Sequence, residues 1–208
     1  MRSQPNRGSA RLTLGERACD HVAYPTLSDL VLAVRARDGD RLALETLVER
    51  HSPSVRRVAG YLLSDPQDAE DAAQEALAKL CTRIGQFRGE SQFATWLYSL
   101  VANTCRDLGE RQRRRRHQSL DGVAEPAGWD EPADLAFQRE QRRELTRRLA
   151  ELSNEQRHVM VMKDVLSLSY EEIAGALRMP VGTVKCHAHR GRRRMRKAFD
   201  GLRQAAGA

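Results

Sequence analysis

Apolar side chains recur at intervals of three and four residues along most of this chain, which is the spacing of helices that bury one face. Between residues 28 and 116 this pattern predicts four successive helices. The first ends at the Asp-Gly-Asp of residues 38–40, and the second is interrupted near Pro53, because proline breaks the helical hydrogen-bond ladder. No alternation of apolar and polar residues persists anywhere in the sequence. The pattern therefore predicts an all-α fold.

The third predicted helix starts at Asp65 and Pro66, a capping residue followed by a residue suited to the first helical position. It runs to about Arg83 and buries a face rich in alanine and leucine. Its other side carries acidic residues three and four positions apart, which therefore share a face. These are Asp68, Asp71 and Glu75. A long fourth helix begins near Ser91 and ends in the arginine-rich residues 111–116.

Residues 169–197 have the layout of a helix-turn-helix. Ser169 and Glu172 have the spacing of a capping box at the start of the first helix. Pro180 cannot continue that helix, and Thr183 is expected to cap the second. The second helix then runs into six cations within eight residues, namely Arg190, Arg192, Arg193, Arg194, Arg196 and Lys197. Their mutual repulsion favours an anionic partner, and DNA phosphates are one.

An abrupt change of composition separates the two helical parts. Residues 119–134 hold five acidic residues, two prolines and two glycines but no lysine or arginine, which is typical of a linker. The sequence thus predicts two small helical domains joined by a flexible acidic linker, the C-terminal one containing the helix-turn-helix. The expected parts are a disordered arm (1–25), a first domain (26–116), a linker (117–136), a second domain (137–200) and a tail (201–208).

The basic charge favours an anionic partner, since the formal net charge is +7 and the sequence pI is about 9.7. No apolar run is long enough to cross a bilayer, and the arginines among the first twenty residues do not fit a secretory signal. We therefore expect a cytoplasmic protein without membrane insertion.

Candidate chemistry is sparse. The four cysteines are scattered, so neither a disulfide framework nor a zinc site is expected, and three of them fall on predicted helices, where cysteine is usually buried. Cys186, His187 and His189 do not share one helical face, so we expect no metal there. The sequence has no phosphate-binding glycine loop and no nucleophile elbow. We expect no enzyme activity, cofactor or small-molecule substrate.

Three segments, in this order, resemble the extracytoplasmic function (ECF) group of bacterial RNA polymerase sigma factors. Residues 68–80 are similar to the acidic motif that binds the polymerase core, and residues 87–115 to the segment that melts and reads the −10 promoter element. Residues 149–196 resemble the domain that reads the −35 element. The absence of room for a middle domain points to the ECF group rather than to primary sigma factors. The resemblance implies a transcription initiation factor that binds core RNA polymerase and promoter DNA under the control of an anti-sigma factor.

The resemblance also implies roles for particular residues. Contacts to the clamp of the largest polymerase subunit are expected from Asp68, Asp71, Gln74 and Glu75. Contacts to the −10 element are expected from Phe87, Arg88, Ser91, Asn103, Arg106 and Arg111, whereas Phe93 and Trp96 are expected to pack the core. Contacts to the −35 element are expected from Thr183, Lys185, His187, Arg190 and Arg194.

The chain departs from the family pattern at the helix-turn-helix. Arg178 stands where glycine is usual, at a turn position that often needs a left-handed backbone. His187 and Ala188 replace residues of the recognition helix, which points to an altered −35 preference. The alternative is a stand-alone helix-turn-helix regulator, because residues 182–187 also resemble two-component response regulators. Such a protein normally carries a receiver domain of alternating strands and helices, which residues 28–116 do not show.

Overall fold

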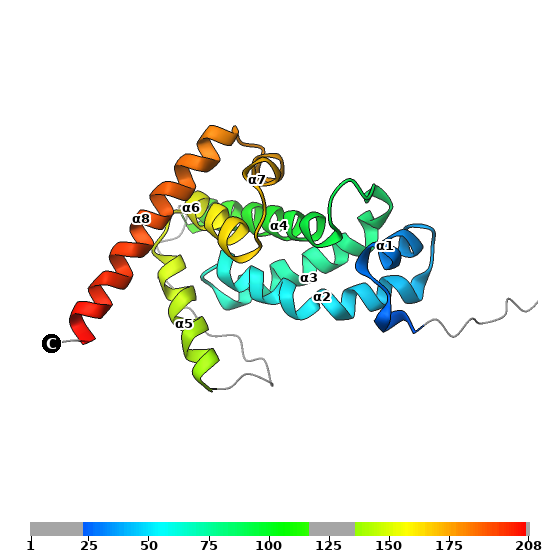
Figure 1. The fold of residues 1–208 in the computed structure, drawn as a ribbon, viewed down its shortest axis with the longest axis horizontal. Coiled ribbons are helices and arrows are strands. Elements are labelled where there is room, and N and C mark those ends of the chain that lie inside the picture. Colours follow the sequence, from blue (N-terminus) through cyan, green and yellow to red (C-terminus); the bar gives the residue numbers. More distant parts are fainter. Residues whose placement is uncertain (1–22, 117–135, 207–208) are drawn as a thin grey trace, which may run out of the picture.

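The computed structural model describes residues 23–116 and 136–206, and these residues form helices without any strand. In the first domain a short 3-10 turn, η1 (Tyr24–Thr26), precedes α1 (Asp29–Arg37), α2 (Arg41–Leu62), α3 (Pro66–Arg83), the turn η2 (Ile84–Gln86) and α4 (Phe93–Arg116). In the second domain α5 (Ala136–Ala150), α6 (Asn154–Met160), the π-turn η3 (Val161–Val165), α7 (Tyr170–Leu177) and α8 (Val181–Ala206) follow. The all-α prediction is confirmed, and Figure 1 shows the two groups of helices side by side.

Local sequence signals set most helix starts in the first domain. The Ser28 hydroxyl accepts a hydrogen bond from the Val31 amide, and the Asp40 carboxylate accepts one from the Ala43 amide. The Asp65 carboxylate accepts from two amides at the start of α3, as its spacing before Pro66 predicts. Each cap satisfies backbone donors that have no partner within the helix.

The expected interruption of the second helix is wrong, because α2 runs through Pro53 as one continuous helix. A proline inside a helix costs about 3 kcal/mol. The helix nevertheless buries Leu47, Val55 and Ala59 completely on either side of it. Burial of a leucine or valine side chain gains about 1.5–3 kcal/mol, so several such residues outweigh one broken hydrogen bond.

Small residues bring α3 close to its neighbours α2 and α4. The face that the sequence predicts to be buried is fully enclosed at Ala69, Ala72, Ala73, Ala76 and Leu80. Because alanine keeps the helix surface flat, α3 lies tightly against both neighbours, and its acidic side is left outside this contact. The position of the acidic residues therefore follows from the buried alanines.

The helix-turn-helix forms as predicted at its first helix. The Ser169 hydroxyl accepts from the Glu172 amide at 3.1 Å, and the Glu172 carboxylate accepts from the Ser169 amide at 2.7 Å, which completes the capping box. Thr183, however, is not the cap of the second helix, because α8 already starts at Val181 and the Thr183 amide donates to the Pro180 carbonyl. The helix also continues to Ala206, so residues 201–206 are helical rather than an irregular tail.

Gly191 lets α8 approach α6 closely. A Cβ atom at this position would lie 2.7 Å from Cγ of Met160, well inside van der Waals contact. The glycine therefore has a packing role that offsets its low helix propensity.

Arg178 holds the left-handed conformation that its position predicts, with φ 53° and ψ 46°. A non-glycine residue in this region costs about 1 kcal/mol. We expect Arg178→Gly to raise the free energy of unfolding by about 1 kcal/mol, measured by urea denaturation. Arg178→Ala keeps the Cβ atom and should bring no gain; an equal gain from alanine would show that the backbone carries no strain here.

Two of the helical cysteines are exposed rather than buried. Cys105 is enclosed in the first domain, and burial raises the pKa of its thiol to about 12, but Cys81 and Cys186 are free and exposed. Helical spacing alone therefore did not decide cysteine burial. No helix in the described part of the chain is long and apolar enough to cross a membrane. The predicted arm to residue 22 and the linker over 117–135 lie outside the described residues.

Candidate protein and nucleic-acid interfaces

The predicted acidic face of α3 is divided into an outward and an inward pair. Asp71 and Gln74 are exposed; the Asp71 carboxylate accepts a hydrogen bond from Gln67, and the Gln74 amide donates one to Glu70, both on the same helix. Asp68 is half-buried and accepts a hydrogen bond from Gln112 of α4 at 2.8 Å. Glu75 is also half-buried and pairs with Lys79 at 2.7 Å. Asp71 and Gln74 are thus accessible at the surface, whereas Asp68 is tied to α4 and Glu75 is paired along α3.

The loop between α3 and α4 is fixed by a cluster of aromatic rings. Phe87 packs edge-on against Phe93, with ring centroids 5.6 Å apart, and lies at 5.6 Å from Trp96. His51 of α2 closes the cluster against Phe93 at 5.3 Å. Such ring pairs add to the stability gained from burying apolar area, so the loop is held by its own aromatic residue.

Phe87 does not present its ring to a nucleic acid in this structure, because only 2% of the residue is exposed. The prediction of a direct contact is therefore corrected: Phe87 anchors the loop. Arg88 beside it is exposed, and Ser91 is half-buried. The expected core positions of Phe93 and Trp96 are confirmed, since Phe93 is buried and Trp96 packs against the core.

The three polar candidates on α4 have different surroundings. Arg111 is exposed, as predicted. Asn103 is half-buried, and its side-chain oxygen is enclosed without a hydrogen-bond partner among the described residues. Arg106 does not point freely into solvent, because its guanidinium donates to the Leu177 carbonyl of α7 at 2.7 Å. This contact with the second domain could not be predicted from the sequence, because Leu177 lies 71 residues further along the chain.

The predicted residues on α8 fall on two faces. Thr183, His187, Arg190 and Arg194 follow intervals of four, three and four and form one stripe along the helix. Lys185 lies about 200° around the axis from Thr183, on another side. Thr183, Lys185, Arg190 and Arg194 are exposed, and His187 is half-buried.

A basic groove of about 460 Å³ lies on the side of α8 that carries Lys185. It is lined by Tyr170, Lys185, His189, Arg192, Arg193 and Arg196. The Tyr170 ring has the Lys163 ammonium 5.0 Å and the Lys185 ammonium 5.8 Å from its centroid. Sequence reasoning missed this groove, although the spacing of 185, 189, 192 and 196 is itself helical.

Arg192 is the most firmly held cation of the groove. Its guanidinium donates to both carboxylate oxygens of Asp164 and to the Tyr170 hydroxyl, and these bonds raise the pKa of Arg192. The groove is therefore preorganised, and its cationic lining is suited to binding anions. The described residues contain no group of histidine, cysteine and carboxylate side chains suited to a metal ion.

Comparison with known proteins assigns both domains. Residues 47–116 match the family model for Sigma-70 region 2, and residues 142–195 match that for Sigma-70 region 4. The chain is 33% identical to the ECF RNA polymerase sigma-E factor of Escherichia coli K12 over 176 residues, which cover 80% of this chain and 91% of that protein.

It is also 31% identical to the RNA polymerase sigma-H factor of Pseudomonas aeruginosa over 188 residues, or 86% of this chain and 97% of that protein. The chain belongs to the ECF sigma factors. As a member of this family it is a transcription initiation factor, which binds core RNA polymerase and directs it to promoters. The first domain is region 2, and the second is region 4.

Solved sigma-factor structures share the fold. The sigma factor RpoE of Bartonella quintana, solved with the anti-sigma factor NepR, has a TM-score of 0.62 and 23% identity, and covers 75% of this chain and 96% of that one. CnrH, solved with the cytosolic domain of CnrY, has a TM-score of 0.59 and 23% identity, and covers 83% of this chain and 97% of that one. The alternative of a response regulator has no support in residues 23–116, which contain helices but no strand.

Proposed function

We propose that this sigma factor binds the clamp of the largest polymerase subunit through Asp71 and Gln74 on the outer side of α3, with Asp68 and Glu75 at the edge of the contact. The observation that supports this is the exposure of the first two residues beside two half-buried carboxylates. A face of this kind complements a basic helical surface, and such complementarity speeds association and fixes register.

The −10 element is contacted by the loop and the exposed side of α4. Arg88, Ser91 and Arg111 are accessible for this role, Asn103 is half-buried beside them, and Arg106 joins them once the second domain leaves α4. Phe87 anchors the loop to α4 through its ring contacts with Phe93 and Trp96. A rigid loop suits recognition of an unstacked base, because the cost of pulling the base out must be offset by preformed contacts.

The −35 element is contacted by α8. The stripe of Thr183, His187, Arg190 and Arg194 is the surface that enters the major groove. Thr183 and His187, near the start of the helix, face the base edges, and Arg190 and Arg194, further along it, contact phosphates at the edge of the groove. Lys185 contacts the phosphate backbone on the other side, together with the groove around Arg192. Phosphate contacts set the position of the domain on DNA, and base contacts specify the sequence.

Removing the cations of the stripe should change the salt dependence of DNA binding. Each phosphate contact contributes about 0.9 to the slope of log affinity against log salt. We expect Arg190→Gln with Arg194→Gln to reduce this slope by about 1 to 2, measured by fluorescence anisotropy on a promoter duplex over a salt series. Arg37→Gln with Arg41→Gln, in the first domain, removes the same charge. An equal loss from that control would assign the effect to net charge.

The two structurally similar proteins were solved as complexes, RpoE with the anti-sigma factor NepR and CnrH with the cytosolic domain of CnrY. By this likeness we infer that an anti-sigma factor controls this chain as well. We also infer that the sigma factor itself acts in the cytoplasm and needs no cofactor.

Run-off transcription with purified core polymerase over a promoter library tests the function. We expect specific transcripts only when the chain is added. Transcripts of equal specificity from core polymerase alone would contradict it.

A further inference from the structure

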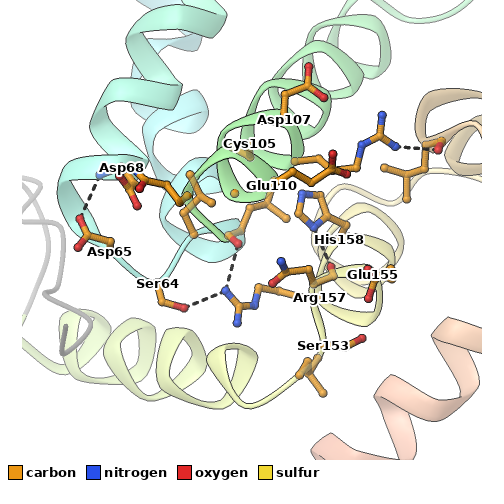
Figure 2. Close-up of a pocket in the computed structure, with 18 of the residues that line it drawn as sticks. Ser64, Asp65, Asp68, Cys105, Asp107, Glu110, Ser153, Glu155, Arg157 and His158 are labelled. Carbon is orange, nitrogen blue, oxygen red and sulfur yellow. Dashed lines mark hydrogen bonds between the residues drawn. The ribbon is translucent and has the colours of Figure 1, made fainter. Parts of the chain in front are cut away.

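Arg157 of region 4 reaches into the end of region 2. Only 6% of this residue is exposed, and its guanidinium donates to four oxygens. Two are the Leu149 and Ala150 carbonyls at the end of α5, at 2.9 Å each. The others are the Leu62 carbonyl, at 3.1 Å, and the Ser64 hydroxyl, at 2.9 Å, where α2 ends. Figure 2 shows Arg157 pointing towards Ser64 across the gap between the domains.

The chemistry of this contact explains its position. The last carbonyls of a helix have no partner within the helix and carry the negative end of its dipole. Arg157 meets such carbonyls from α2 and from α5 at once, and a guanidinium offers five donors in a rigid fork. One side chain of region 4 therefore satisfies the ends of two helices from the two domains.

A second arginine makes the reciprocal contact. Arg106 of α4, in region 2, donates to the Leu177 carbonyl at the end of α7, in region 4. A cleft of about 940 Å³ lies around the two arginines and is lined by polar and apolar residues of both domains, among them Asp68, Glu110, Glu155, Leu152 and Leu177. The domains are thus fastened by directional hydrogen bonds around an open cleft. Such a contact is easier to break than a close-packed apolar core.

The closed arrangement affects the promoter-contacting side of α4. The Arg106 guanidinium is occupied by Leu177, and α7 lies against α4 at this point. We propose that the free chain is held in a closed, autoinhibited conformation by Arg157 and Arg106, and that promoter recognition requires region 4 to leave α4. The occlusion of DNA rests on the proposed role of Arg106, but the closure itself does not.

Closure is measured by fluorescence energy transfer between dyes on Cys81 of α3 and Cys186 of α8, both exposed. Cys19 is replaced by serine, and Cys105 is enclosed. We expect high transfer in the free chain and an about tenfold fall in the closed-to-open ratio for Arg157→Met. Arg147→Met is the matched control, because the ion pair of Arg147 lies within α5. Equal transfer in Arg157→Met and Arg147→Met would overturn the proposal.

Arg106→Gln provides a second variant if loss of the buried Arg157 prevents folding, since Arg106 is only half-buried. It should lower the closed-to-open ratio about threefold with unchanged helical circular dichroism. No change in the ratio would contradict the proposal that Arg106 helps to hold the closed conformation. Addition of core polymerase to the wild-type chain should also lower the transfer. Transfer that stays high when polymerase is bound would contradict the need for opening.

Occlusion is measured with unlabelled protein on a promoter duplex chosen from the run-off library. Arg157→Met should bind this duplex at least threefold more tightly than Arg147→Met. Equal affinity in a variant that the transfer measurement shows to be open would overturn occlusion. Failure of the proposed function would appear instead as absent transcription by the wild-type chain.

Discussion

Replacing Asp71 and Glu75 together by arginine should abolish association with core RNA polymerase. The change turns two negative charges on the proposed docking face of α3 into positive ones, so attraction to a basic surface becomes repulsion. Loss of one close charge pair at an interface costs about 2–5 kcal/mol, so two reversals should weaken binding a hundredfold or more. Binding is measured by the co-migration of chain and core enzyme in gel filtration and by run-off transcription.

The control for this pair is Glu45→Arg with Glu49→Arg on α2, which changes net charge by the same amount at exposed positions. Arginine at position 75 also lies one turn from Lys79, and like charges at this spacing cost only a few tenths of a kcal/mol. The fold should therefore survive, as circular dichroism would show. Equal loss of binding in the control, or retained binding in the α3 variant, would place the polymerase contact elsewhere.

Acid should destabilise the chain through His158. The residue is 4% exposed, and its Nδ1 atom donates to the Asn154 carbonyl at 2.8 Å. Its Nε2 atom is buried without a hydrogen-bond partner among the described residues. Protonation would place a charge and an unmatched donor there, beside Arg157 and Arg106, whereas the Asn154 carbonyl and the Glu155 carboxylate favour the charged form. Burial, together with the two arginines, lowers the pKa of His158 to about 4.

The sign follows from proton uptake. An unfolded histidine binds its proton below about pH 6.5, whereas folded His158 stays neutral to about pH 4. Its contribution to stability is therefore complete above pH 6.5 and is lost as the pH falls towards 4. At about 1.4 kcal/mol for each pH unit, the loss at pH 4.5 is about 2–3 kcal/mol.

His158→Gln removes this titration while keeping a polar side chain, and urea denaturation at pH 7 and at pH 4.5 measures the effect. The wild-type chain should lose about 2–3 kcal/mol more than the variant between the two pH values. The carboxylates titrate in both proteins and cancel in the comparison. Equal losses would show that His158 is not held neutral by its surroundings.

The sequence by itself determined most of the helices and most of their caps, because these depend on neighbours a few residues apart. The capping box of Ser169 and Glu172, the start of α3 at Asp65 and Pro66, and the left-handed Arg178 are all local features. The buried alanines of α3 also follow from spacing along the chain, and the family resemblance rested on three motifs in their order. The polymerase and promoter contacts themselves stay predictions.

Only the tertiary structure decided which surfaces are accessible. Burial of Phe87 depends on the rings of Phe93 and Trp96 from α4, and the continuity of α2 through Pro53 depends on packing against other helices. The contacts of Arg106 and Arg157 between the domains could not be predicted for the same reason. Their acceptors, the Leu177 and Leu62 carbonyls, lie 71 and 95 residues away in the chain. Helical periodicity fixes the direction of a side chain around its own axis, but the neighbour it meets depends on how separate helices pack.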